Sequence, residues 1–252
     1  MSHNTEANRS HWNENAATYN TRFEKTIQQI IEEIQAKRDW IGVDWVDDES
    51  ESESSASTTK YPKKTVRLLD YACGTGLVSR ALAPYVTQCV GIDLSEGMVA
   101  EYNKSVSNQG IPSSEMFAQA GNLIDADEPS PAALSGPEFH NFDIAVVGLG
   151  FHHFDNPTLA SKRLAERLKP GGVLLIVDFL PHEHFHHHDN PAAKTVTHMG
   201  FSEEEVKKMF EEAGAGGGFV YVKIGKGVVF ANVDGQGHKM ERSVFFARGS
   251  KL

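Results

Sequence analysis

The stretch that most constrains the fold is residues 66–95, in which two short apolar runs flank a small-residue turn and a helical pattern. The first apolar run ends at Asp70, the turn Ala-Cys-Gly-Thr-Gly occupies residues 72–76, and the second run ends at Asp93. An apolar run bounded by turn residues is typical of a buried strand. The stretch therefore predicts a β-turn-α-β unit, with its glycines where strand meets helix.

This unit predicts a ligand site. Glycines let the backbone pass close to a ligand, and the free N–H groups and dipole of a helix start favour an anionic group. Asp93 follows Asp70 by about 20 residues, the spacing at which an acid accepts both hydroxyls of a ribose. The alternative is a plain α/β turn that binds nothing.

The glycine pattern disfavours a dinucleotide. A pyrophosphate-binding turn has the pattern G-x-G-x-x-G, whereas the third glycine position here is Ser79. Asp70 at the front of the turn would repel a pyrophosphate but could pair with an amino group. The predicted ligand is therefore a nucleoside with a zwitterionic tail.

Three stretches carry a family resemblance. Residues 70–76 resemble motif I, D-x-G-x-G-x-G, of class I S-adenosylmethionine-dependent methyltransferases, with Ala72 in place of a glycine. Residues 142–149 (FDIAVVGL) resemble the family's strand beside the sulfonium, and residues 168–179 (LKPGGVLLIVDF) its turn into strand five. The overall likeness is to small-molecule methyltransferases of the ubiquinone/menaquinone-biosynthesis type.

The resemblance implies an α/β fold: a Rossmann-like, doubly wound, seven-stranded, mostly parallel sheet with a terminal antiparallel hairpin and an N-terminal helical cap. It also implies S-adenosylmethionine as cofactor, with S-adenosylhomocysteine as product. Leu94 and Met98 would flank the adenine, and Asn122 would accept from the adenine amino group through its side-chain oxygen, where relatives often have Asp. The full set of implied cofactor residues is Tyr19, Asp70, Ala72, Cys73, Gly74, Gly76, Asp93, Leu94, Met98, Asn122, Leu123, Val147 and Gly148.

The chain divides into three parts by composition. Residues 1–46 form a helical cap, with a polar, disordered start over residues 1–8. Residues 47–60 are acidic and serine-rich and are expected to be a disordered loop. Residues 61–252 form the core, with a lid insert at residues 180–200 and two final strands at residues 219–230 and 242–248.

Charge and composition restrict the partners. The net charge of −10 disfavours nucleic acid, which binds basic surfaces. The two cysteines, Cys73 and Cys89, form no disulfide framework, and no stretch is typical of a signal peptide or a membrane span. We therefore expect a cytoplasmic protein with a small-molecule substrate.

Two histidines are candidates for proton transfer. His152 and His153 follow the apolar run of residues 142–149, and open α/β sheets bind ligands at the carboxyl ends of their strands. Histidine can take a proton near neutral pH, which a hydroxyl, thiol or protonated amine acceptor would require. Alternatively, both residues have structural roles.

The lid insert is histidine-rich. We expect His182, His184, Phe185 and His198 to face the substrate. Histidines four apart could hold a metal on a helix, which leaves a metal-dependent methyltransferase as an alternative, although the polar segment favours a loop and we predict no metal. The alternative to an enzyme is a regulatory or interaction protein that binds S-adenosylmethionine without turnover.

Overall fold

The computed structural model describes residues 2–46, 64–183, 194–224, 227–231 and 239–252. The expected acidic loop, residues 47–60, lies outside them. Three helices precede the sheet: α1 (His3–Arg22), α2 (Glu24–Ala36) and α3 (Arg38–Ile41). The later helices are α4 (Leu77–Leu82), α5 (Glu96–Asn108), α6 (Pro157–Arg167) and α7 (Glu203–Glu212), with short 3-10 turns η1 (Ala83–Tyr85), η2 (Ala132–Leu134), η3 (Pro137–Phe139) and η4 (Phe151–His153).

Seven strands form the main sheet, in the order β3-β2-β1-β4-β5-β9-β6. Strands β1 to β5 pair in parallel, whereas β9 runs antiparallel to both β5 and β6. This confirms the predicted seven-stranded, mostly parallel sheet. The bounds are β1 (Arg67–Tyr71), β2 (Gln88–Asp93), β3 (Met116–Ala120), β4 (Phe142–Gly148), β5 (Leu168–Phe179), β6 (Gly217–Lys223) and β9 (Val244–Ser250).

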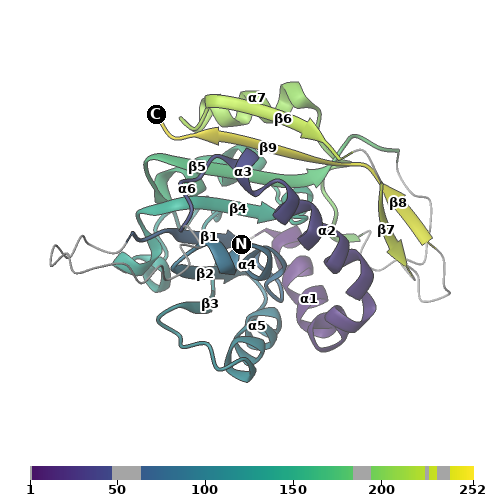
Figure 1. Ribbon diagram of the computed structural model, residues 1–252. Helices are drawn as coiled ribbons and strands as arrows, with labels where there is room; N and C mark the ends of the chain where they lie inside the picture. The colour runs from purple at the N-terminus through teal and green to yellow at the C-terminus, as the bar shows by residue number, and fades with distance from the viewer. Residues whose placement is uncertain (1, 47–63, 184–193, 225–226, 232–238) are drawn as a thin grey trace, which may run out of the picture.

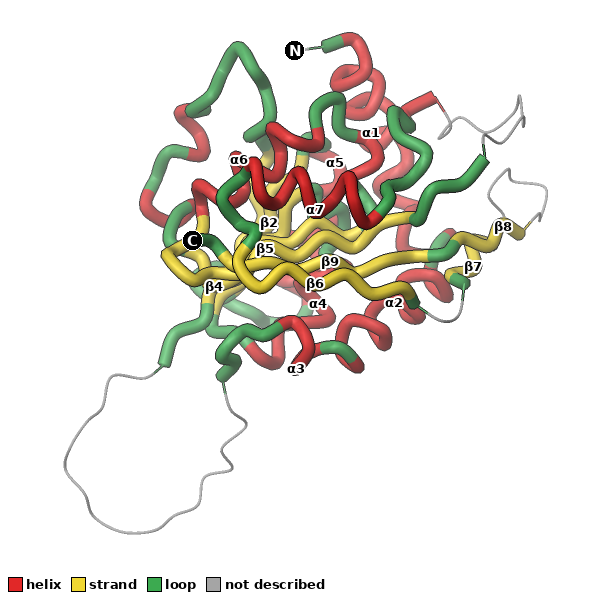
Figure 2. The backbone as a smooth tube through the Cα atoms, turned by 90° about the horizontal axis from the view of Figure 1, so that it is seen from above, coloured by secondary structure: helices red, strands yellow, loops and turns green. Residues whose placement is uncertain are grey.

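The sheet separates two apolar cores, because successive side chains of a strand point to opposite faces. Along β1, Leu68 packs with α2, α4 and α5, whereas Leu69 packs with α6 and α7. Figure 2 shows α6 and α7 on one side of the sheet and α2, α3 and α4 on the other. The strand order reverses between β1 and β4, and ligands bind at such a switch point.

The N-terminal helix is longer than predicted. Residues 1–8 were expected to be disordered, but α1 begins at His3, with Ser2 as its N-cap. Asn4 donates through Nδ2 to Asp155 Oδ1 at 2.8 Å, and Ser2 also donates to the Asp155 carboxylate. A carboxylate at a helix N-terminus stabilises the helix, which explains why such a polar segment is ordered.

The C-terminal strands differ from the prediction. The expected strand at residues 219–230 is divided into β6 and β7 (Val228–Ala231), and β7 pairs with β8 (Lys239–Arg242) in a separate hairpin. Gln29 and Thr26 of α2 bond the backbone of this hairpin, with Thr26 Oγ1 donating to the Val229 carbonyl oxygen at 2.7 Å. Figure 1 shows the hairpin beside α2, beyond the main sheet.

Candidate active site

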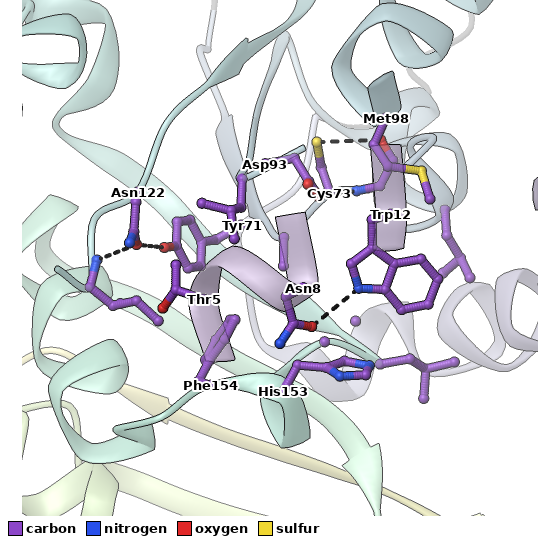
Figure 3. Close-up of a pocket in the computed structure, with 18 of the residues that line it drawn as sticks. Thr5, Asn8, Trp12, Tyr71, Cys73, Asp93, Met98, Asn122, His153 and Phe154 are labelled. Carbon is purple, nitrogen blue, oxygen red and sulfur yellow. Dashed lines mark hydrogen bonds between the residues drawn. The ribbon is translucent and has the colours of Figure 1, made fainter. Parts of the chain in front are cut away.

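A cavity of about 130 Å³ lies at the carboxyl ends of β1, β2 and β4, under α1. Thr5, Asn8, Trp12 and Tyr19 of α1 form its cover. Ten of the expected site residues line it: Tyr19, Ala72, Cys73, Gly74, Asp93, Leu94, Met98, Asn122, Gly148 and His153. Figure 3 shows Asp93, Asn122 and His153 around this cavity, with Trp12 and Asn8 above His153.

Asp93 is prepared to bind two hydroxyls. Its Oδ2 accepts from the backbone N–H of Gly74 at 2.8 Å, and its Oδ1 accepts from the N–H of Ser95 at 2.8 Å. Each oxygen keeps a lone pair, because an ionised carboxylate accepts about four hydrogen bonds. Burial raises the pKa of Asp93, and the same N–H groups act against that rise. Two backbone N–H groups thus hold the side chain in place, and its remaining lone pairs are available to a ligand in the cavity that it lines.

The turn after β1 follows the path that its sequence predicts. Ala72 (φ 55°), Gly74 (φ 52°) and Gly76 (φ 91°) are all left-handed, a conformation that glycine adopts freely and alanine does not. Ala72 and Gly74 line the cavity, and Gly150 faces Ala72: a Cβ on Gly150 would lie 2.9 Å from the Ala72 Cβ. The turn after β1 and the segment after β4 therefore approach each other closely, and together they form one wall of the cavity.

Tyr19, on the cavity wall, suits the carboxylate of an amino-acid ligand. Burial raises the pKa of Tyr19 to about 12, so its hydroxyl is a neutral donor, and the Arg80 charge acts against that rise. Arg80 Nη2 is buried without a hydrogen-bond partner in the described part of the chain. Arg80 does not line the cavity, so its charge acts on the site from behind the wall. The cavity thus fits a zwitterionic nucleoside at its ribose and amino-acid ends.

Asp70 lies behind the cavity wall rather than on it. Its Oδ2 accepts from the Ser79 N–H at 2.9 Å and from Ser79 Oγ at 2.8 Å, and Tyr102 donates in turn to that hydroxyl. Burial raises the pKa of Asp70 to about 7. Through this oxygen Asp70 ties β1 to α4, and its contact with a ligand amino group stays a prediction.

Four further expected residues also lie away from the cavity surface. Leu123 and Val147 are buried in the core of α6 and α7. A Cβ on Gly76 would lie 2.8 Å from the Tyr102 ring, so this glycine serves the packing of α5. His152 is buried, and its Nδ1 lies 2.8 Å from Asp178 Oδ1.

His153 is the histidine that reaches the cavity. Its Nδ1 lies 2.8 Å from the carbonyl oxygen of Thr195, and because a carbonyl can only accept, Nδ1 carries the proton. Nε2 then holds the lone pair of the neutral ring. Burial, and then the neighbouring His152, lower the pKa of His153 well below its usual value. Trp12 packs edge-on against the ring at 5.5 Å.

The predicted lid residues have other positions. The His182 ring lies edge-on to Phe179, and its backbone N–H donates to the Met199 carbonyl oxygen. His198 donates through Nε2 to the Phe154 carbonyl oxygen at 3.0 Å. Neither lines the cavity. His184 and Phe185 lie outside the described residues. Within the described ranges, no three His, Cys, Asp or Glu side chains converge as a metal site would require.

Sequence reasoning missed half of the cavity lining. The missed residues are Thr5, Asn8, Trp12, Tyr71, Thr75, Leu77, Ile124, Leu149, Gly150, Phe154 and Asp155. The helical spacing of Trp12 and Tyr19 is the signal that could have revealed the α1 side.

Among the described helices, none has the length and apolarity needed to span a membrane.

Comparisons with known proteins point to one family. A family model described as a methyltransferase domain matches residues 27–215. An uncharacterized methyltransferase of Schizosaccharomyces pombe is 31% identical over 158 residues, covering 61% of this chain and 54% of that protein. A ubiquinone/menaquinone biosynthesis C-methyltransferase of Hydrogenovibrio crunogenus is 30% identical over 115 residues, covering 44% of this chain and 41% of that protein.

One solved structure has a similar fold. The YcgJ protein of Bacillus subtilis matches with a TM-score of 0.54 and 20% identity, over 74% of this chain and 92% of that chain. At this identity the match supports the fold alone. The chain spans about half the length of the curated relatives that it matches.

Proposed function

This chain belongs to the methyltransferase-domain family, with S-adenosylmethionine as its cofactor, and on that premise we propose that it methylates an uncharged small-molecule nucleophile. The observation that carries the proposal is the position of Asp93 and His153 on one cavity: a fixed carboxylate for a ribose and a neutral imidazole with its lone pair available. The class of acceptor and the role of His153 are both part of the proposal.

The cofactor, when bound, supplies a sulfonium methyl group that is already a good electrophile. The chain has to hold the nucleoside, align the acceptor and exclude water. Asp93 would bind the ribose hydroxyls, and Tyr19 the carboxylate. Helix α1 covers the cavity from one side, with Trp12 and Asn8 above His153, so the acceptor would react away from bulk water.

His153 would accept the proton of the nucleophile. Its pKa lies well below 6.5, so the ring is neutral at physiological pH and Nε2 can accept a hydrogen bond from a hydroxyl or thiol. The Thr195 carbonyl fixes the tautomer through Nδ1. A positioned base contributes about 10²- to 10⁴-fold in rate, and because a lowered pKa makes a weaker base, we place His153 at the lower end of that range.

The charges on the cavity wall favour a particular class of acceptor. The described lining contains the carboxylates of Asp93 and Asp155 and neither Lys nor Arg. An acceptor that carries a phosphate or carboxylate would meet these two carboxylates, with no Lys or Arg on the described lining to offset their repulsion. We therefore propose a neutral acceptor with a hydroxyl or thiol group, in the cytoplasm, and the net charge of −10 favours this over nucleic acid.

A labelled-methyl assay tests the proposal. The chain is incubated with methyl-labelled S-adenosylmethionine and with matched acceptor pairs, each an alcohol or thiol beside its phosphorylated or carboxylated derivative. We expect transfer to at least one neutral member and at least tenfold less to its anionic partner. Preferred transfer to anionic acceptors would refute the acceptor class. Binding of the cofactor with no transfer to any pair would favour a S-adenosylmethionine-binding protein without turnover.

A further inference from the structure

Asn122 is held by a chain of hydrogen bonds at the end of the cavity opposite His153. Its Oδ1 accepts from the backbone N–H of Ile124 at 3.0 Å and lies 3.2 Å from the Tyr71 hydroxyl. The same hydroxyl accepts from the backbone N–H of Leu123 at 3.1 Å. Figure 3 shows the contacts of Asn122 with Tyr71 and with the neighbouring backbone nitrogen.

These contacts fix which way the amide points. A backbone N–H can only donate, so the atom facing Ile124 must be the amide oxygen rather than the nitrogen. The Tyr71 hydroxyl already accepts from Leu123, and burial raises its pKa, so it stays protonated. Its single proton is therefore directed to Asn122 Oδ1.

Both lone pairs of the Asn122 oxygen are thus occupied. The side-chain nitrogen, with two N–H groups, has no hydrogen bond to any residue that the structure describes, and Asn122 lines the cavity. Turning the amide over would place N–H groups against the Ile124 N–H and would lose two hydrogen bonds. The group that this side chain offers a ligand is a donor.

We propose that Asn122 binds the purine base of the cofactor as a hydrogen-bond donor to N1 or N7, the two accepting ring nitrogens that flank the exocyclic amino group, and does not recognise that amino group. The proposal rests on the proposed cofactor site. It reverses the expectation from sequence, in which the amide oxygen would accept from the 6-amino group. It also gives Tyr71 a positioning role, because its hydroxyl holds the amide oxygen away from the base.

Three analogues of S-adenosylhomocysteine test this assignment by calorimetric titration. The 6-deamino analogue lacks the exocyclic amino group, whereas the 1-deaza and 7-deaza analogues each replace one ring nitrogen with C–H. We expect the deamino analogue to bind within about twofold of the parent compound. One of the deaza analogues should bind about three- to tenfold more weakly, the range of one neutral hydrogen bond.

Two variants make the test specific. Asn122→Ala should bind the parent and the weakened deaza analogue equally, because the donor is gone from both complexes. Asn122→Asp can keep both bonds on one oxygen but offers an acceptor with the other, so it should bind the parent at least as weakly as Asn122→Ala. Thermal melting of each variant checks that it is folded.

A tenfold loss with the deamino analogue, together with full affinity for both deaza analogues, would overturn the donor assignment. Tighter binding of the parent by Asn122→Asp than by the unchanged chain would overturn it as well. Failure of the parent compound to bind the unchanged chain would instead overturn the proposed cofactor site, so the two failures are distinguishable.

Discussion

The Nδ1 atom of His153 lies 2.8 Å from the carbonyl oxygen of Thr195, and Asn8 of α1 donates to the same oxygen at 3.1 Å. One backbone carbonyl therefore links the cavity histidine, the covering helix and the segment that follows β5. This relationship sets the tautomer of His153 and explains why its lone pair is available at Nε2.

Replacing His153 with Asn tests its role as proton acceptor. The Asn side-chain nitrogen can occupy the place of Nδ1 and keep the bond to Thr195, but nothing replaces Nε2. We expect kcat to fall at least 100-fold, with affinity for S-adenosylhomocysteine within about twofold. An unchanged kcat with the acceptor found in the labelled-methyl assay would show that the ring has no part in proton transfer.

The depressed pKa of His153 predicts a stability that depends on pH. In the unfolded chain the imidazole takes a proton near pH 6.5, whereas the folded chain resists it until a much lower pH. Between these values the unfolded state binds more protons, so the free energy of unfolding falls as the pH falls below 6.5. Urea unfolding at pH 7.5 and 5.5 measures this fall.

His153→Asn is the matched control for that pH effect, since it lacks the titrating ring. The unchanged chain should lose more stability than the variant between pH 7.5 and 5.5. An equal loss in both proteins would assign the pH dependence to other groups.

Asp155 should hold α1 over the cavity. Its carboxylate accepts from Asn4, and Ser2 and Thr5 donate to it as well. Asp155→Ala removes this carboxylate from the helix N-terminus, where such a charge is worth about 0.3–1 kcal/mol. We expect faster amide exchange in residues 3–8 and weaker binding of S-adenosylhomocysteine. The exposed Asp127→Ala is the control, and equal exchange in both variants would contradict the role of Asp155.

Ala72 carries backbone strain that glycine would relieve. Its φ of 55° is left-handed, which costs an L-residue about 1–2 kcal/mol, partly offset by the greater chain entropy of glycine. Ala72→Gly should therefore raise the free energy of unfolding by up to about 1 kcal/mol. Ala133→Gly, at an exposed position without positive φ, should lower it. A destabilised Ala72→Gly would mean that packing of the methyl group outweighs strain.

The central sheet could be predicted from sequence because its signals are local. Apolar runs such as residues 142–149 and the turn at residues 72–76 specify strands and their ends directly. Asp93 could be placed in the site for the same reason, because it ends its strand at the edge of the sheet where ligands bind. These parts of the fold and the site need no knowledge of distant contacts.

The parts that sequence reasoning missed depend on contacts between distant residues. His152 and His153 are adjacent in sequence, and only the bonds of the first to Asp178 and of the second to Thr195 decide which one reaches the cavity. The bonds of Asp70 to Ser79, which hold it beneath the turn, could not be read from the sequence either. The first turn of α1 is polar and is ordered through Asp155, a residue about 150 positions away.

The most direct measurement is calorimetric titration of S-adenosylhomocysteine into the unchanged chain, Asp93→Ala and the control Asp127→Ala. We predict micromolar binding, about −8 kcal/mol, to the unchanged chain and the control, and a loss of at least tenfold in Asp93→Ala, whose carboxylate faces the cavity. Equal affinity in all three proteins, or no binding to the unchanged chain, would contradict the assignment of this cavity to the cofactor.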